Sequence, residues 1–233
     1  MPISLALGKP LTGVVLARLA AAGLAGRIID VGPGNGVYAR LFRSLAPGAD
    51  WCAVEAWGPY VETYGLRDLY DQVVVADVRY LDFGKLGPAD LILFGDVLEH
   101  MTAADATAVM EAAGRQVRFL AMSIPVGHWP QEEIFGNPFE VHVEDHLSHA
   151  DIQAMIPGLC GGQAYVGETG QGVGVYFAAS DPANRGVLAG HVDAAAEIVA
   201  RAASPALDAA SVDFLDPEET AAYGRVIAEA AGN

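Results

Sequence analysis

The sequence predicts an α/β protein whose mostly parallel sheet is covered by helices on both faces. Two observations support this fold class. Short apolar runs rich in β-branched residues alternate with segments of helical spacing, and the runs are apolar throughout rather than alternating. Strands of that kind are buried on both sides, which requires helices on each face of a parallel sheet. The predicted strands cover residues 27–31, 51–55, 72–77, 90–96 and 117–125.

Helices are expected before, between and after these strands. They are predicted at residues 10–25, 37–45, 57–66, 103–113 and 149–156. The last of these leads into a closing pair of strands, 163–168 and 172–180. Beyond Asp181, two alanine-rich helices are expected at 187–202 and 217–230, separated by Ser204 and Pro205. We therefore expect a domain over residues 1–180 and a helical extension over 181–233, packed on the domain or on a second copy in a homodimer.

Composition excludes several classes of protein. The chain has 233 residues, 52% of them hydrophobic and 18% charged, which suits a folded domain and argues against disorder. Its formal net charge of −16 repels phosphate backbones and anionic membranes, so nucleic acid is disfavoured as a partner. No apolar run approaches the roughly 20 residues of a membrane span, and no signal segment is evident. We expect a cytoplasmic protein.

The first predicted strand ends in an acid and a glycine loop. Asp30 lies in the strand, and Gly32, Gly34 and Gly36 alternate with other residues after it. Glycine is needed where backbone approaches a ligand closely or turns with positive φ. The spacing differs from the G-x-G-x-x-G dinucleotide fingerprint and from the phosphate-binding P-loop. The segment predicts close approach of the backbone to a ligand other than these.

Asp30 and this loop resemble the first motif, E/DxGxGxG, of class I S-adenosylmethionine-dependent methyltransferases. The resemblance covers residues 26–125. It implies a Rossmann-like, mostly parallel seven-stranded sheet with an antiparallel last strand. It also implies S-adenosyl-L-methionine as cofactor and S-adenosyl-L-homocysteine as product.

The resemblance assigns a role to the acid at each strand end. Glu55 would bind the ribose hydroxyls because one carboxylate offers two acceptor oxygens, and Asp77 would accept from the adenine amine. Asp96 begins a D-V-L-E-H segment beside the methionine part and the methyl group. Each acid alone is also explained as a solvated strand end, but four at successive strand ends favour a binding site. The predicted cofactor-binding residues are Asp30, Gly32, Gly34, Asn35, Gly36, Glu55, Ala56, Asp77, Val78, Asp96 and Val97.

Residues 127–147, here called the lid, interrupt the alternation of strands and helices. A connection of this length in a compact domain is usually functional, and its aromatic residues favour an ordered cover over the substrate. His128, His142 and His146 are candidate bases, since histidine commonly accepts a proton near neutral pH. His142 ranks first because the segment N-P-F-E-x-H resembles one that follows the fifth strand in small-molecule and sugar methyltransferases. His100 is expected to orient a helix start or contact cofactor.

A divalent metal is the minor alternative for the lid. His142, Asp145 and His146 lie close together in sequence among several glutamates, and these are metal-ligand types. Mg²⁺ prefers carboxylates over histidine, however, and an acidic loop is usually just solvated. We therefore predict no metal site.

The expected function is transfer of a methyl group to a hydroxyl, or an amine, of a small molecule such as a sugar or natural product. Two alternatives stay open. In the first alternative, the chain is a non-catalytic S-adenosylmethionine-binding interaction or regulatory protein whose C-terminal helices dock a partner. In the second, it methylates a protein or a carboxyl group, because nothing in the sequence determines substrate size.

Overall fold

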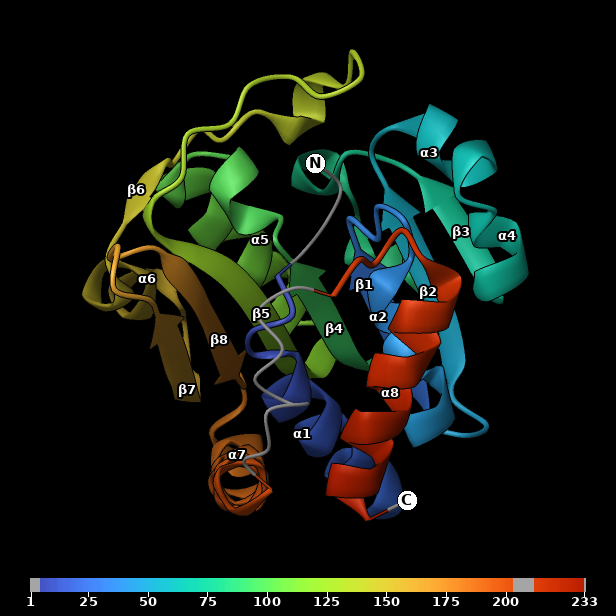
Figure 1. Cartoon of the computed structure of the whole chain (residues 1–233), viewed down its shortest axis with the longest axis vertical. Coiled ribbons are helices and arrows are strands. Elements are labelled where there is room, and N and C mark those ends of the chain that lie inside the picture. Colours follow the sequence, from blue (N-terminus) through green and yellow to red (C-terminus); the bar gives the residue numbers. More distant parts are fainter. Residues whose placement is uncertain (1–4, 203–211, 233) are drawn as a thin grey trace.

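The centre of the fold is one sheet with helices on both faces (Figure 1). The computed structural model describes residues 5–202 and 212–232. Seven strands follow the order β3-β2-β1-β4-β5-β8-β7, and the two-residue strand β6 pairs with β5. The strands are β1 (Arg27–Val31), β2 (Asp50–Glu55), β3 (Gln72–Val75), β4 (Ala89–Gly95), β5 (Val117–His128), β6 (His146–Leu147), β7 (Leu159–Val166) and β8 (Gly172–Ala178).

The direction of the strands confirms the predicted fold class. β1 to β5 run parallel to one another, and β8, the last strand of the chain, inserts antiparallel between β5 and β7. The order reverses between β1 and β4, so the loops after these two strands diverge at the carboxyl edge. That divergence opens the crevice in which ligands bind in such sheets.

Alternating side chains of each strand enter two separate cores. Ile28 packs in one core and its neighbour Ile29 in the other, as the two-residue period of a strand requires. The first core includes α1 (Lys9–Ala21), α2 (Val37–Phe42), α7 (Pro182–Arg201) and α8 (Pro217–Ala231); the second includes α5 (Ala103–Gly114) and α6 (His149–Met155). No described helix is both long enough and apolar enough to cross a bilayer.

The two C-terminal helices pack on the sheet domain of the same chain. α8 lies against α1 and α2, while α7 lies against α1, β7 and β8. Leu188, Val192, Tyr223 and Ile227 are buried in the core that contains α1. The predicted break at Ser204 and Pro205 lies outside the described residues. A homodimer through these helices stays a prediction.

Several predicted element boundaries were wrong. The helix expected at 57–66 is two short helices, α3 (Gly58–Thr63) and α4 (Leu66–Leu69), because Gly65 between them has φ 62°. α7 begins at Pro182, five residues before the expected start. β5 continues to His128, three residues beyond the expected end, so the lid begins as strand.

The lid is a hairpin that prolongs β5 and β6 (Figure 1). The Trp129 N–H donates to the Asp145 carbonyl at 2.7 Å, and the His142 N–H donates to the Gln131 carbonyl at 3.0 Å. A single bridge, Ile134 to Asn137, closes the tip. These backbone bonds order the predicted loop and fix the positions of its side chains.

Candidate functional site

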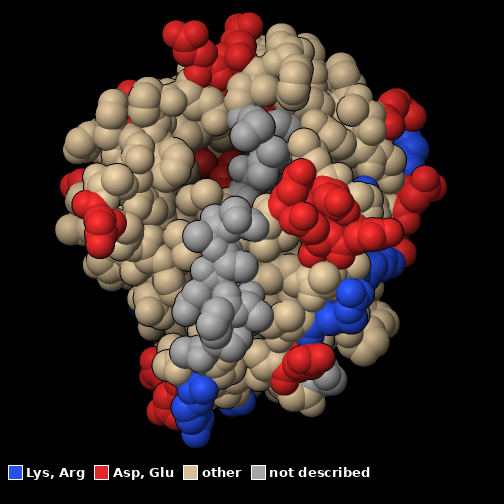
Figure 2. All heavy atoms as spheres, in the orientation of Figure 1, with Lys and Arg blue, Asp and Glu red and all other residues tan. Residues whose placement is uncertain are grey.

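A cavity of about 510 Å³ lies at the carboxyl edge of the sheet, between the glycine loop and the lid. Figure 2 shows a hollow near the middle of this face with acidic atoms at its base. The predicted cofactor residues that line the cavity are Gly32, Gly34, Glu55, Ala56, Asp77, Val78, Asp96 and Val97. The structure thus brings together residues from the ends of β1, β2, β3 and β4.

Close packing explains two of the loop glycines. Gly32 has φ 63°, and a Cβ there would overlap Cγ2 of Val97. Gly36 has φ 79° and precedes the first residue of α2, where a Cβ would lie 2.6 Å from Cδ1 of Leu69. Glycine is therefore required by both conformation and space. The loop backbone lies directly against the segment that follows β4.

Three predicted cofactor residues, Asp30, Asn35 and Gly36, do not line the cavity. Asp30 is fully buried and accepts a hydrogen bond from the Tyr70 hydroxyl at 2.5 Å. The Asn35 amide donates to the carbonyl of Phe214 at 3.0 Å, and Gly36 directly precedes α2. Burial raises the pKa of Asp30 to about 7, against the opposing effects of Tyr70 and Lys9. The contacts of Asp30 and Asn35 therefore hold the glycine loop in place from outside the cavity.

Glu55 and Asp77 line the cavity but already have protein partners. Glu55 accepts from the Trp57 N–H at 2.7 Å and from the Gly34 N–H at 3.4 Å. Burial raises the pKa of Glu55 to about 7 despite these two bonds. Asp77 pairs with Arg79, whose nitrogens contact both of its oxygens at 2.6 to 3.0 Å. Burial raises the pKa of Asp77, but the bonds from Arg79 outweigh it and the pKa lies below its usual value.

Asp96 has a strained backbone at the cavity wall. Its φ of 56° is in the left-handed region, which costs a non-glycine residue about 1–2 kcal/mol. The Ser123 hydroxyl donates to its carboxylate at 2.8 Å, and the Asp96 N–H donates to the Ser123 carbonyl at 2.9 Å. Strain held by neighbouring contacts is typical of functional sites.

Of the three candidate bases, the structure brings only His142 to the cavity. His128 and His146 are exposed register partners on β5 and β6, with ring centroids 5.6 Å apart. Because β6 pairs with β5 at this point, His146 lies beside His128 on the ladder, away from His142. The minor alternative, in which His142, Asp145 and His146 surround a metal, therefore does not hold.

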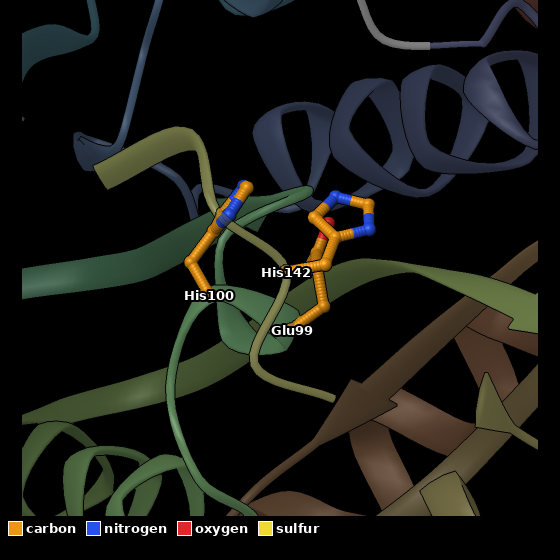
Figure 3. Close-up of side chains that lie close together, drawn as sticks. All are labelled: Glu99, His100 and His142. Carbon is orange, nitrogen blue, oxygen red and sulfur yellow. The ribbon is translucent and has the colours of Figure 1, made fainter. Parts of the chain in front are cut away.

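The structure instead groups His142 with Glu99 and His100 (Figure 3). The N–H groups of Val143 and Glu144 both donate to the Glu99 carbonyl, at 2.9 and 3.0 Å. These bonds hold the returning strand of the lid against the segment after β4. All three side chains line the cavity, and the two imidazole rings lie 4.9 Å apart in an edge-on arrangement.

Backbone carbonyls determine the protonation of both rings. Nδ1 of His100 lies 3.1 Å from the Val141 carbonyl, and Nδ1 of His142 lies 2.5 Å from the Trp129 carbonyl. A carbonyl can only accept, so Nδ1 of each ring is the nitrogen that donates, and Nε2 is the one that remains available to a ligand. Burial lowers the pKa of His100 to about 4, against the opposing bond to Val141, so this ring is neutral at neutral pH.

A buried lysine offsets the acidic groups around the cavity. Lys9, 1% exposed, donates to the Tyr38 hydroxyl at 2.9 Å and lies 4.1 Å from the centre of that ring. Burial lowers the pKa of Lys9, while the charges of Asp96, Asp30 and Glu99 raise it. The amphipathic pattern of α1 held no signal for this lysine. Its position is decided only by packing of the helix on the sheet.

Tyr60 of α3 fastens the lid through Glu140, and Gln131 binds the same glutamate within the lid. The Tyr60 hydroxyl donates to Glu140 at 3.0 Å, and the Gln131 amide donates to the Glu140 carbonyl at 2.7 Å. Tyr60, Gln131 and Glu140 all line the cavity. Sequence reasoning missed them. It also gave no role to Glu99, although that residue lies inside the D-V-L-E-H segment already singled out.

Comparison with solved structures identifies the class of fold. The N-terminal domain of EvdMO1 with SAH bound has a TM-score of 0.53 at 18% identity, over 75% of this chain and 82% of that chain. An S-adenosylmethionine-dependent methyltransferase from Clostridium acetobutylicum ATCC 824 has a TM-score of 0.55 at 11% identity, over 74% and 92%. No protein-family model and no curated protein matches the sequence. The chain has the class I methyltransferase fold.

Proposed function

We propose that the protein is an S-adenosylmethionine-dependent methyltransferase that acts on a hydroxyl, or an amine, of a small molecule such as a sugar or natural product. One observation carries the proposal: the same cavity joins the glycine loop, Glu55 and Asp77 to His100 and to His142 of the lid. Its volume of about 510 Å³ lies within the range of about 300–1,000 Å³ for small-molecule sites.

The neighbouring structures support the choice of cofactor and acceptor. The EvdMO1 domain was solved with SAH bound, and also in the presence of SAH and D-fucose. Gly32 and Gly34 of the loop and the acids Glu55, Asp77 and Asp96 line one side of the cavity, which supports the assignment of the cofactor to that side. The lid side of the cavity is then the place for the acceptor.

Methyl transfer needs an aligned nucleophile and somewhere for its proton to go. The carbon–sulfur bond breaks as the carbon–oxygen bond forms, S-adenosylhomocysteine leaves, and the acceptor hydroxyl loses its proton. In a metal-free reaction, Nε2 of His142 would take that proton, because its Nδ1 is committed to Trp129. His100 is a poor base, since its pKa is held at about 4.

Calorimetric titration with S-adenosylhomocysteine tests the cofactor assignment. We expect binding to the wild type, and about 10- to 100-fold weaker binding to Glu55→Ala, which loses a charged acceptor for the ribose. Asp77→Ala should weaken binding less, because Arg79 already occupies part of that carboxylate. Glu62→Ala on α3 is the matched control, since this exposed side chain does not line the cavity. Unchanged affinity in both cavity variants would show that the cofactor lies elsewhere.

A turnover screen with a labelled methyl donor separates the proposal from its rivals. Transfer to sugars or other small hydroxyl compounds supports it. S-adenosylhomocysteine binding without transfer to any acceptor would favour the non-catalytic binding protein. Transfer only to proteins or carboxylates would favour the other alternative.

A further inference from the structure

We infer that Glu99, His100 and His142 form a binding site for a divalent first-row transition-metal ion inside the cavity. The ion would hold the acceptor hydroxyl of the methyl-transfer reaction; this second part rests on the proposed function. One ligand atom from each side chain lies within 4.8 Å of the others (Figure 3). Glu99 and His100 come from the segment after β4 and His142 from the lid.

The geometry needs little change to bind an ion. Metal–ligand bonds of about 2.0–2.2 Å place neighbouring ligand atoms roughly 3–4 Å apart. The three atoms therefore have to close by at most about 2 Å. Side-chain rotation supplies such a shift, and the backbone bonds from Val143 and Glu144 to Glu99 already hold the two segments together.

The hydrogen bonds that orient the two imidazoles are those of metal-binding histidines. A histidine that binds a metal through one nitrogen usually donates its other N–H to a carbonyl or carboxylate, which fixes its orientation. Both His100 and His142 do this through Nδ1, to Val141 and Trp129. This leaves Nε2 of each ring as the nitrogen that would bind the ion.

The carboxylate of Glu99 is an independent indication of a ligand. The residue is 1% exposed, yet neither of its carboxylate oxygens accepts a hydrogen bond from another described residue. A buried carboxylate is unfavourable unless its charge is compensated; Lys9 supplies part of the opposing charge, and a bound cation would supply more. Neither His100 nor His142 donates a hydrogen bond to this carboxylate.

The donor set indicates the class of ion. Two imidazoles and one carboxylate suit Mn²⁺, Fe²⁺, Co²⁺ or Zn²⁺, whereas Mg²⁺ prefers oxygen ligands and retains its waters. Three protein ligands leave coordination positions open for substrate, as at catalytic rather than structural sites. These positions would face the cavity that the three side chains line.

The ion would change the role of His142 in the reaction. Its Nε2 would bind the metal and not the proton. An acceptor hydroxyl bound to the ion has a lowered pKa and releases its proton to water. The resulting alkoxide attacks the methyl carbon, the carbon–sulfur bond breaks, and neutral S-adenosylhomocysteine leaves. No oxidant or reductant takes part.

Metal titration of the full chain tests the site without any turnover. After treatment with a chelator and dialysis, calorimetry with MnCl₂ and ZnCl₂ should show one strong site, and MgCl₂ should bind at least about tenfold more weakly. Glu99→Gln and His100→Ala should each weaken Mn²⁺ binding by about 10- to 100-fold. Glu99→Gln preserves side-chain size, so it decides the result if His100→Ala fails to fold.

The double variant His128→Ala/His146→Ala is the matched control, because it removes two histidines outside the cavity. It should bind Mn²⁺ as the wild type does. The inference is overturned if the wild type binds no Mn²⁺ in a one-to-one ratio. It is also overturned if Mn²⁺ binding is lost in this control but kept in Glu99→Gln. S-adenosylhomocysteine binding without metal binding would leave the proposed function standing, whereas metal binding without S-adenosylhomocysteine binding would refute only the cofactor assignment.

Discussion

Replacing Gly32 by alanine tests how closely the glycine loop packs against the wall of the cavity. Alanine at φ 63° costs about 1–2 kcal/mol in backbone strain. Its Cβ would also overlap Cγ2 of Val97, well inside the carbon–carbon contact distance of about 3.5 Å. Overpacking of this kind costs about 1–3 kcal/mol. The free energy of unfolding should therefore fall by about 2–5 kcal/mol, a large part of the roughly 5–15 kcal/mol typical of a domain.

Two further variants separate these contributions. Gly48 has φ 85°, and a Cβ there would meet nothing within 4 Å, so Gly48→Ala should lose only the backbone cost of about 1–2 kcal/mol. Val97→Ala removes the methyl group that would be overlapped. Combined with Gly32→Ala, it should recover the steric part, which gives a coupling of about 1–3 kcal/mol in a double-mutant cycle.

Urea unfolding measures the free energies of the wild type and all four variants, and calorimetry measures how each binds S-adenosylhomocysteine. The reasoning is refuted if Gly32→Ala costs no more than Gly48→Ala. A coupling to Val97 within about 0.5 kcal/mol of zero would equally refute it. If Gly32→Ala binds S-adenosylhomocysteine more weakly and the added Val97→Ala substitution restores the affinity, the packing of the loop contributes to cofactor binding.

Two further predictions concern pH and the lid. The pKa of Asp30 is raised by burial from 3.8 to about 7, so the folded state binds this proton more tightly than the unfolded state. The contribution of protonated Asp30 to the free energy of unfolding is then fully present below about pH 4. It is lost, by about 4 kcal/mol in total, as the pH rises through about 7. Asp30→Asn should flatten this slope in urea unfolding between about pH 5 and 8; an unchanged slope would contradict the assignment. Tyr60→Phe should remove one of the hydrogen bonds to Glu140 and speed hydrogen exchange in the lid, with Tyr80→Phe, an exposed tyrosine, as the control. Equal exchange in both variants would show that Tyr60 does not fasten the lid.

The elements predicted best from sequence were those with a strong local signal. β1 was predicted with its observed bounds, because a run of β-branched residues ended in a glycine loop. The helix over 57–66 was predicted less well, because its periodicity hid the left-handed turn at Gly65. Local sequence patterns predict burial and turns. They predict the end of a helix only where a residue such as glycine is recognised as helix-terminating.

The neighbours of the lid histidines could not be predicted from the sequence. Proximity along the chain grouped His142 with His146, but pairing with β5 places His146 beside His128 instead. The true neighbours of His142 are Glu99 and His100, which lie far earlier in the chain. Hydrogen bonds from the lid backbone to the Glu99 carbonyl create that contact, and no periodicity encodes them.

The sequence by itself determined the order of strands and helices, the glycine loop and the acids at successive strand ends. Parallel strands bring all their carboxyl ends to one edge, so these residues had to converge once the elements formed. Only the tertiary structure decided that Asp30 is buried against Tyr70, that Lys9 offsets the buried acids, and that His142 of the lid meets Glu99 and His100. Such contacts depend on how helices and hairpins pack on the sheet, and that packing sums many weak interactions between residues far apart in the chain.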